Sequence, residues 1–216
     1  MPALRRCCAM VVVLGLLGRV SMVAPAAEGL PPLANAQWIW AAESADVCEL
    51  RRVFTLDAAP TRATALITAD NSYLLRVNGA PIGEDQGAGS EVWQSVERYD
   101  LTGRLVKGRN VIHVRGIDLG GIRGVVAALR VEFENKPPLD ILTDGSWRAW
   151  LGESAVDASH PEFVEGPNWV PARVVGAMGM APWGGLAWSE ESERRERALR
   201  AGIEVVYQDL ALCDNL

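Results

Sequence analysis

The sequence contains little lysine and little histidine. Of its 21 basic residues only Lys107 and Lys136 are lysines, and 27 acidic residues give a net charge of -6 and an isoelectric point near 5.1. Proteins that bind nucleic acid normally carry a basic patch or stripe, because phosphate contacts supply much of their affinity. The composition therefore argues against a nucleic-acid partner.

The spacings of common metal, haem and nucleophile motifs are also missing. The chain has four Cys and two His, but no CxxC, no CxxCH and no His pair at ligand spacing. This excludes zinc ribbons and covalently attached haem. No GxSxG elbow occurs, and the partial GxG at residues 87–89 is not followed by a βαβ unit. A non-catalytic protein is therefore the preferred class, although the many carboxylates leave the question of an enzyme open.

The N-terminal 27 residues have the pattern of a secretory signal peptide. Arg5 and Arg6 precede an apolar run from Cys7 to Leu17, and small residues follow at 24–27. The run is shorter than the roughly 20 residues of a membrane-spanning helix, so a retained anchor is the less favoured alternative. Cleavage removes three basic residues and no acidic one, which leaves a net charge of -9. We expect a secreted or periplasmic protein that is not held in a membrane after cleavage.

Two cysteines remain after cleavage, Cys48 and Cys213. In an oxidising compartment they could form a disulfide, and two unrelated thiols are an equally open interpretation.

The mature chain is patterned as strands almost throughout. Residues 129–134 alternate between apolar and charged side chains, the period of a half-buried strand. Residues 73–77 lead into Asn78-Gly79, a strong hairpin signal because both residues tolerate positive φ. We expect an all-β antiparallel sandwich of about eight strands. Its predicted buried residues are Leu75, Val77, Ile112, Val114, Leu129, Val131 and Phe133, with Trp38 and Trp40 on one face of a strand and His113 on a less buried face. Three later indoles, Trp147, Trp169 and Trp183, are also predicted to pack in the core.

A series of short motifs in a fixed order spans residues 36–188. They are Trp38-Ile39-Trp40, Arg52-Val53-Phe54, Ala69-Asp70-Asn71-Ser72-Tyr73, Val77-Asn78-Gly79, Tyr99-Asp100-Leu101-Thr102, Gly108-Arg109-Asn110-Val111-Ile112 and Thr143-Asp144-Gly145-Ser146-Trp147. The series resembles the galactose-binding-like jelly-roll modules, in particular the N-terminal accessory domains of bacterial α-L-rhamnosidases and related large secreted proteins. The resemblance implies a β-sandwich whose loops at one end often contact carbohydrate. A structural calcium is compatible with it, but no dense Asp or Asn ligand run occurs and no cofactor is predicted.

Three loops carry the candidate binding residues. Residues 84–93 combine acids and an amide with Trp93, whose indole could stack on a sugar ring while the polar groups take its hydroxyls. The loops around Asp70-Asn71 and around Asp118 and Arg123 could meet it at one end of the sandwich. The alternative is a solvated loop with Trp93 folded onto the sheet.

The chain changes character after residue 188. Residues 189–216 begin with four Glu-to-Arg pairs at i,i+4 spacing, which favour an exposed linker helix. The apolar run 203–207 then resembles the first strand of a further element.

Three function classes remain open. The preferred one is a secreted, non-catalytic carbohydrate-binding or accessory module, with a carbohydrate ligand and a neighbouring domain of a longer protein as partners. The alternatives are a structural or protein-interaction module, and a fragment of a glycoside hydrolase.

Overall fold

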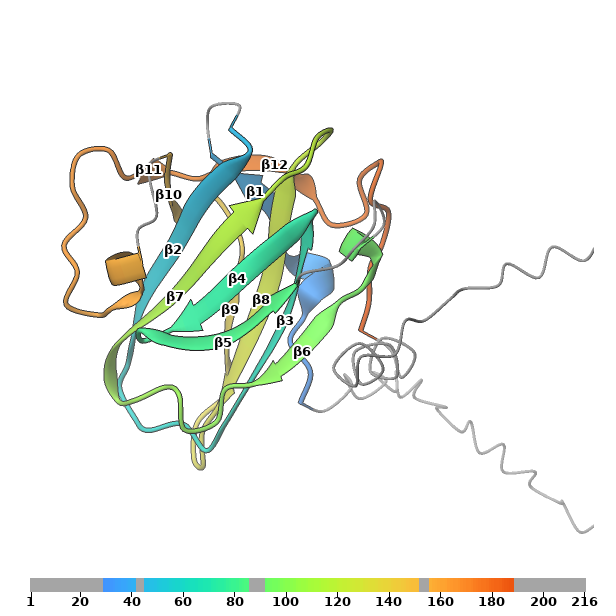
Figure 1. The fold of residues 1–216 in the computed structure, drawn as a ribbon. Coiled ribbons are helices and arrows are strands. Elements are labelled where there is room, and N and C mark those ends of the chain that lie inside the picture. Colours follow the sequence, from blue (N-terminus) through green and yellow to red (C-terminus); the bar gives the residue numbers. More distant parts are fainter. Residues whose placement is uncertain (1–28, 42–44, 86–91, 152–155, 189–216) are drawn as a thin grey trace, which may run out of the picture.

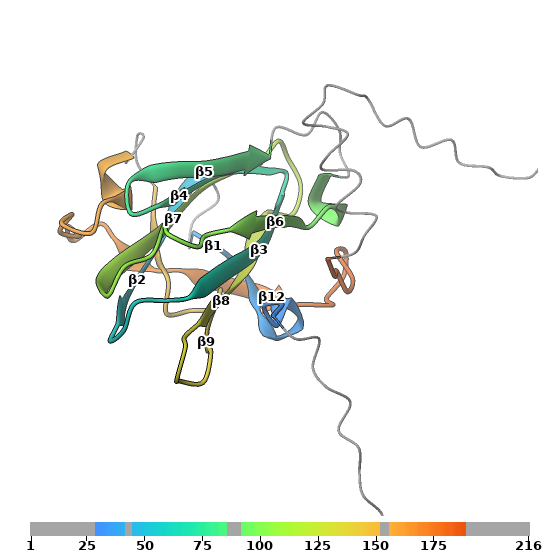
Figure 2. The ribbon, with the colours of Figure 1, turned by 90° about the horizontal axis from the view of Figure 1, so that it is seen from below.

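The computed structural model describes residues 29–41, 45–85, 92–151 and 156–188, and these form two facing antiparallel sheets (Figure 1). Sheet A has the spatial order β12 (Arg173–Ala177), β1 (Gln37–Trp40), β8 (Gly124–Glu132), β3 (Arg62–Asp70) and β6 (Glu97–Asp100), and β9 (Leu139–Leu142) also pairs with β8. Sheet B has the order β11 (Val170–Pro171), β10 (Arg148–Trp150), β2 (Val47–Leu56), β7 (Gly108–Ile117), β4 (Ser72–Val77) and β5 (Ala80–Asp85). Figure 2 shows the layers, with β4, β5 and β7 in one and β3, β8 and β12 in the other.

The predicted all-β antiparallel sandwich is confirmed. The described residues form twelve strands rather than about eight, because the Gly- and Pro-rich stretch after residue 138 adds β9 to β12, of two to five residues each. Three short 3-10 helices are present, η1 (Leu33–Asn35), η2 (Val92–Gln94) and η3 (Val156–Ser159). None of the helices in the described part has the length and apolarity required to cross a membrane. The expected signal peptide and the expected linker helix lie outside the described residues.

The Asn78-Gly79 hairpin joins β4 to β5 as predicted. Asn78 has φ 50° and Gly79 has φ 83°, the left-handed conformations that this tight turn requires. The Asn78 side chain also accepts a hydrogen bond from the Val111 N–H at 2.8 Å. The turn is thereby tied to β7, the central strand of sheet B.

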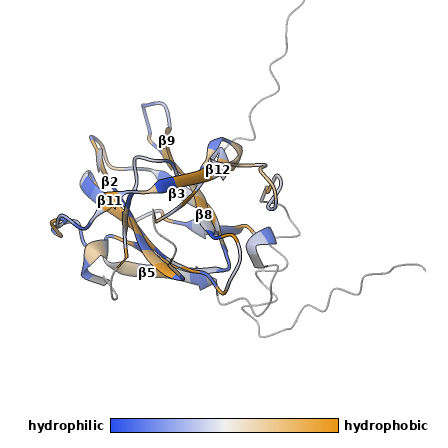
Figure 3. Ribbon diagram, turned by 90° about the horizontal axis from the view of Figure 1, so that it is seen from above, coloured by the Kyte–Doolittle hydropathy of each residue, from blue (hydrophilic) through white to orange (hydrophobic). Residues whose placement is uncertain are grey.

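An inner core fills the space between the sheets. Apolar side chains alternate toward it along the longer strands, and Figure 3 shows hydrophobic segments within the strands. Six of the seven predicted core residues are buried there, and Phe133 is half-buried against it. The six are Leu75, Val77, Ile112, Val114, Leu129 and Val131.

A second apolar cluster covers the outer face of sheet A, and we call it the outer cluster. Its buried members are Leu33, Ala36, Trp38, Leu66, Val96, Val126, Ala128 and Trp183. The prediction that Trp38 and Trp40 share a face is wrong, although both are fully buried. A β-bulge between Trp38 and Ile39 turns Trp38 into the outer cluster and leaves Trp40 in the inner core. The other predicted core indoles, Trp147, Trp169 and Trp183, are buried.

His113 is buried, and its prediction as a less buried strand residue is wrong. Its side chain lies on the outer face of sheet B, with Nε2 3.1 Å from Glu49 Oε2. The burial arises because η3 and the loop that follows it pack beside β2 and β7 (Figure 1). Alternation along β7 could not reveal this covering loop.

Cys48 is buried in the inner core. Burial raises the pKa of this thiol far above its ordinary value. Cys213 lies outside the described residues, so the pairing stays a prediction.

Candidate functional site

The structure brings four of the predicted site residues to one end of the sandwich. Asp70 ends β3 and Asn71 follows it, while Asp118 follows β7 and Arg123 precedes β8. The pairing of β3 with β8 places Asp70 opposite Gly124, and the pairing of β4 with β7 places Ser72 opposite Ile117. The β3–β4 turn and the β7–β8 loop therefore lie side by side.

Asp118 and Arg123 form an ion pair across the β7–β8 loop. Asp118 Oδ2 lies 3.0 Å from Arg123 Nη2, with the carboxylate fully buried and the arginine side chain 17% exposed. Arg123 Nη1 also lies 3.4 Å from Asp46 Oδ1. A buried carboxylate is costly unless it is paired, so Arg123 compensates Asp118 and still presents part of its guanidinium to solvent.

Asp70 is a second buried carboxylate at this end. Its Oδ2 accepts a hydrogen bond of 2.8 Å from the indole Nε1 of Trp183. Burial raises the pKa of Asp70 above the ordinary carboxyl range, the Trp183 hydrogen bond opposes this, and the negative charge of Asp118 adds to it. The two carboxylates are therefore close enough to interact electrostatically.

Asn71 fixes the position of the β7–β8 loop. Its Oδ1 accepts a hydrogen bond of 2.7 Å from the Leu119 N–H, and its own N–H donates to the Ile117 carbonyl at 3.0 Å. The loop beyond this anchor exposes Leu119 (78%) and Ile122 (49%) around two glycines with positive φ. Apolar groups therefore border the polar residues of the site.

Trp93 lies beside β3 in η2. Its carbonyl accepts a hydrogen bond of 3.0 Å from Thr68 Oγ1, two residues before Asp70, and its half-buried side chain packs against the outer cluster. Most of the loop 84–93 lies outside the described residues. The role of Trp93 as a stacking platform stays a prediction.

Three side chains at this end could contribute oxygen ligands to a cation. No group of three or more His, Cys, Asp or Glu able to hold a metal ion occurs in the described part of the chain. The carboxylates of Asp70 and Asp118 and the amide of Asn71 are the candidate donors, whereas Ca²⁺ takes six to eight oxygens. A calcium here would need further oxygens, from water or from a ligand.

Sequence reasoning missed two partners of the site, Trp183 and Asp46. Asp46 also accepts the Asp118 N–H through its carbonyl at 2.7 Å. Trp183 is 113 residues from Asp70 in the sequence and reaches it because the segment after β12 folds over sheet A. No local pattern signals such a contact.

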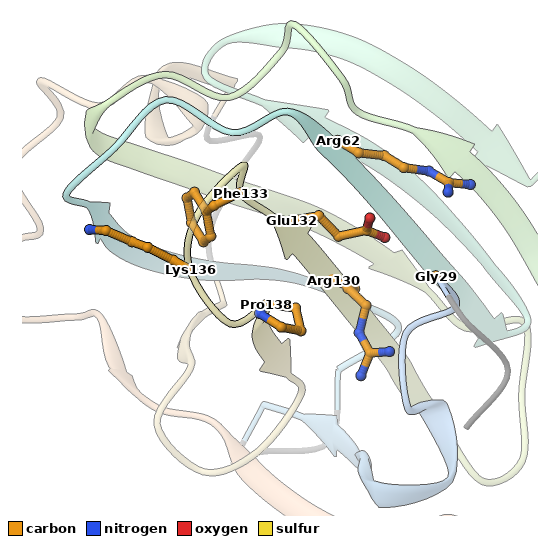
Figure 4. Close-up of a pocket in the computed structure, with 7 residues that line it drawn as sticks. All are labelled: Gly29, Arg62, Arg130, Glu132, Phe133, Lys136 and Pro138. Carbon is orange, nitrogen blue, oxygen red and sulfur yellow. The ribbon is translucent and has the colours of Figure 1, made fainter. Parts of the chain in front are cut away.

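A hollow of about 560 Å³ lies elsewhere, beside β3 and β8 (Figure 4). The side chains of Arg62, Glu132 and Arg130 project into it side by side. Arg130 forms a two-point ion pair with Asp140 at 2.8 Å, and Lys136 pairs with Asp57. Two of its three cations are thus compensated within the chain, which disfavours this hollow as an anion site.

Comparison with known proteins identifies the relatives of this sandwich. No protein-family model matches the chain. An α-L-rhamnosidase of Streptomyces avermitilis is 30% identical in an alignment of 177 positions that covers 78% of this chain and 17% of that protein. The crystal structure of Streptomyces avermitilis α-L-rhamnosidase complexed with L-rhamnose matches 72% of this chain and 16% of its own, at 29% identity and a TM-score of 0.65. This chain is similar to a β-sandwich segment of α-L-rhamnosidases.

A lectin shares the same fold. The Pleurotus ostreatus lectin in complex with GalNAc matches 74% of this chain and 49% of its own, at 25% identity and a TM-score of 0.63. The predicted resemblance to rhamnosidase-associated jelly-roll modules is therefore confirmed. The chain spans about a sixth of the length of the curated rhamnosidase that it matches.

Proposed function

We propose that this chain is a secreted, non-catalytic carbohydrate-binding module whose site comprises Asp70, Asn71, Asp118, Arg123 and Trp93. The observation that carries the proposal is the gathering of two buried carboxylates, an amide and a partly exposed guanidinium at one end of the sandwich. The rhamnosidase and lectin structures of the same fold, solved with L-rhamnose and with GalNAc, support it.

The chemistry of this end suits sugar hydroxyls. The exposed part of the Arg123 guanidinium can donate to a sugar hydroxyl, and the slightly exposed edges of Asp70 and Asn71 can accept. The Asp118 carboxylate is fully buried and serves to hold Arg123 in place. An indole at Trp93 would pack on the apolar face of a pyranose ring. Such a shallow site binds a monosaccharide weakly, because few contacts offset the freedom lost on association.

A binding measurement with matched variants tests the site. Calorimetric titration of the purified protein uses L-rhamnose and GalNAc as probes, with Trp93→Ala and Asp70→Asn as site variants. Asp57→Asn is the control, since Asp57 is an exposed acid beyond the C-terminal end of β2, at the opposite end of the sandwich. We expect binding in the parent protein and in the control, and loss of the contribution of this site, seen as reduced heat and stoichiometry, in both site variants. An unchanged isotherm in both site variants would overturn the assignment.

A structural or protein-interaction module is the second candidate function. It is favoured by the internal use of the site's side chains, because Asp70 accepts from Trp183 and Asn71 accepts from Leu119. If no sugar binds and Asp70→Asn or Asn71→Ala changes only the free energy of unfolding, these residues serve the fold and this second function becomes the leading one.

The secreted location is tested by the mature N-terminus. When the full chain is expressed with its own leader in a bacterial host, mass spectrometry of the exported protein should show a new N-terminus near residue 27 or 28. Recovery of the uncleaved chain in the membrane fraction would support a retained anchor instead.

A further inference from the structure

A second hollow, of about 540 Å³, lies at the edge of sheet B where β10 and β11 meet. Its lining includes Ala149, Trp150, Pro167, Asn168, Val170 and Pro171. Ala149 is buried and Trp150 is half-buried, whereas Pro167, Asn168, Val170 and Pro171 are exposed. We call it the Trp150 groove.

The indole of Trp150 is held rigidly in this groove. It stacks on Trp169 with ring centroids 5.9 Å apart and an angle of 24° between the planes. Trp169 is buried, and Phe163 packs edge-on against it at 6.0 Å. The Trp169 carbonyl accepts a hydrogen bond from the Arg148 guanidinium, whose Nε also pairs with Glu165 at 3.1 Å. A half-exposed aromatic surface is thus fixed before any ligand arrives, which lowers the entropy cost of binding.

The lining of the groove selects a neutral ligand with an apolar face. None of the described residues that line it carries a charge, and Asn168 offers a side-chain amide with two donors and one acceptor. Its volume lies in the range of small-molecule sites, which combine apolar walls with a few polar groups. A neutral pyranose matches this chemistry, because its ring has a flat C–H face for the indole and hydroxyls for the amide.

We propose that the Trp150 groove is a second carbohydrate-binding site, specific for neutral pyranose sugars. It goes beyond the function proposed above, because it shares no lining residue with the Asp70 site. Strand β2 separates the two, with β10 on one side of it and β7 on the other. The groove can therefore bind sugar whether or not the Asp70 site does.

Nuclear magnetic resonance of the nitrogen-15-labelled protein tests the proposal. The Trp150 indole N–H resonance is assigned by its loss in Trp150→Phe, and L-rhamnose, GalNAc and methyl β-D-glucopyranoside are each titrated to about 50 mM, well above a millimolar Kd. We expect a saturable shift of this resonance with one or more of the three sugars, and a smaller response to D-galacturonate. Absence of any shift from all three neutral sugars would overturn the proposal.

Variants separate this site from the Asp70 site. Trp150→Ala lacks the indole resonance, so its binding is followed by the Asn168 side-chain amide resonances. It should bind about tenfold or more weakly, since truncation of a central aromatic anchor removes most of the contact. Because Trp150 also packs on Trp169, Asn168→Ala serves as a variant at an exposed position, with an expected loss of severalfold. Val174→Ala, an exposed valine outside the groove, is the control and should leave the affinity unchanged.

The Asp70→Asn variant makes the two proposals distinguishable. The Trp150 shift should persist in Asp70→Asn with unchanged affinity, whereas loss of that shift would place the binding at the other site and overturn this inference. If the Trp150 shift persists and Asp70→Asn alters no other sugar response, the Asp70 assignment fails while the groove stands.

Discussion

The outer faces of the two sheets are both covered by chain segments, but by different physical means. On sheet A the cover is apolar: Trp183 stacks on Trp38 with ring centroids 4.1 Å apart, and Met178 and Met180 pack nearby. On sheet B the cover is polar, and it centres on one arginine. Both covers bury strand residues that would otherwise face water.

Arg51 holds the cover of sheet B. Its guanidinium donates to the carbonyls of Ala158 at 2.7 Å and of His160 and Phe163 at 3.3 Å, and it pairs with Glu165 at 2.6 Å. Burial lowers the pKa of Arg51, and the Glu165 carboxylate opposes this shift.

The apolar cover of sheet A and the polar cover of sheet B stabilise the fold in different ways. Truncation of a buried apolar side chain lowers the free energy of unfolding roughly in proportion to the apolar contacts that it removes. A buried charge is different, because removing its partner leaves groups without compensation. The two covers should therefore respond differently to truncation and to conservative replacement.

Truncation of the apolar cover should have the largest effect. Trp183→Ala removes the stack on Trp38 and the hydrogen bond to Asp70, so we expect a loss of about 4 kcal/mol in the free energy of unfolding. Urea denaturation measures it. Trp188→Ala, a half-buried indole of the same cluster, is the control and should lose less. A loss below about 1 kcal/mol for Trp183→Ala would show that the segment contributes little to the fold.

Removal of the Arg51 guanidinium should lower the free energy of unfolding somewhat less. Arg51→Met keeps much of the side-chain volume but leaves three carbonyls and Glu165 without the guanidinium, and we expect a loss of about 3 kcal/mol. Limited proteolysis within residues 157–165 should quicken in parallel. Glu165→Gln retains an acceptor and should lose about 1 kcal/mol. If Arg51→Met were as stable as the parent, the polar cover would not depend on this arginine.

A smaller loss of stability is expected in the inner core, where Gly116 of sheet B packs against Trp40 of sheet A. A methyl group at Gly116 would lie 2.5 Å from the Trp40 ring. Gly116→Ala should therefore cost about 2 kcal/mol through overpacking. Gly166→Ala is the control, since nothing lies within 4 Å of its added carbon. Equal thermal stability of the two variants would contradict the close packing of Trp40 on β7.

The smallest expected change in the free energy of unfolding is at Asp70, which lies beneath the apolar cover of sheet A. Its pKa is raised in the folded protein, so the folded state holds the proton more tightly than the unfolded chain. Stability from this group is present below the ordinary carboxyl pKa of about 4 and is lost as pH rises through the higher folded value. Asp70→Asn should thus be slightly more stable than the parent at pH 7, and this difference should vanish near pH 3. A stability gain that is independent of pH would contradict this explanation.

Local sequence patterns correctly predicted the elements that depend on interactions between neighbouring residues. The Asn78-Gly79 turn follows from two residues that tolerate positive φ, and the apolar positions of β8 follow from the pleat. The site residues Asp70, Asn71, Asp118 and Arg123 were found because turns at the ends of strands carry polar side chains. Their convergence was expected from the sandwich and is present, whereas their sugar-binding role stays a proposal.

The predictions that were wrong concern residues whose surroundings come from distant segments of the chain. His113 alternates as an exposed residue would, yet it is fully buried where η3 packs beside β7. Trp38 and Trp40 are separated by a bulge that no sequence period marks.

The sequence by itself determined the antiparallel strands, the β4–β5 hairpin and the apolar positions of the inner core, because period and turn chemistry act between neighbouring residues. Only the tertiary structure decided which outer faces are covered, that Trp183 reaches Asp70, and that Trp150 lines a groove. These depend on contacts across about a hundred residues or on loop paths, and such contacts are selected by the packing of the whole sandwich rather than by any local preference.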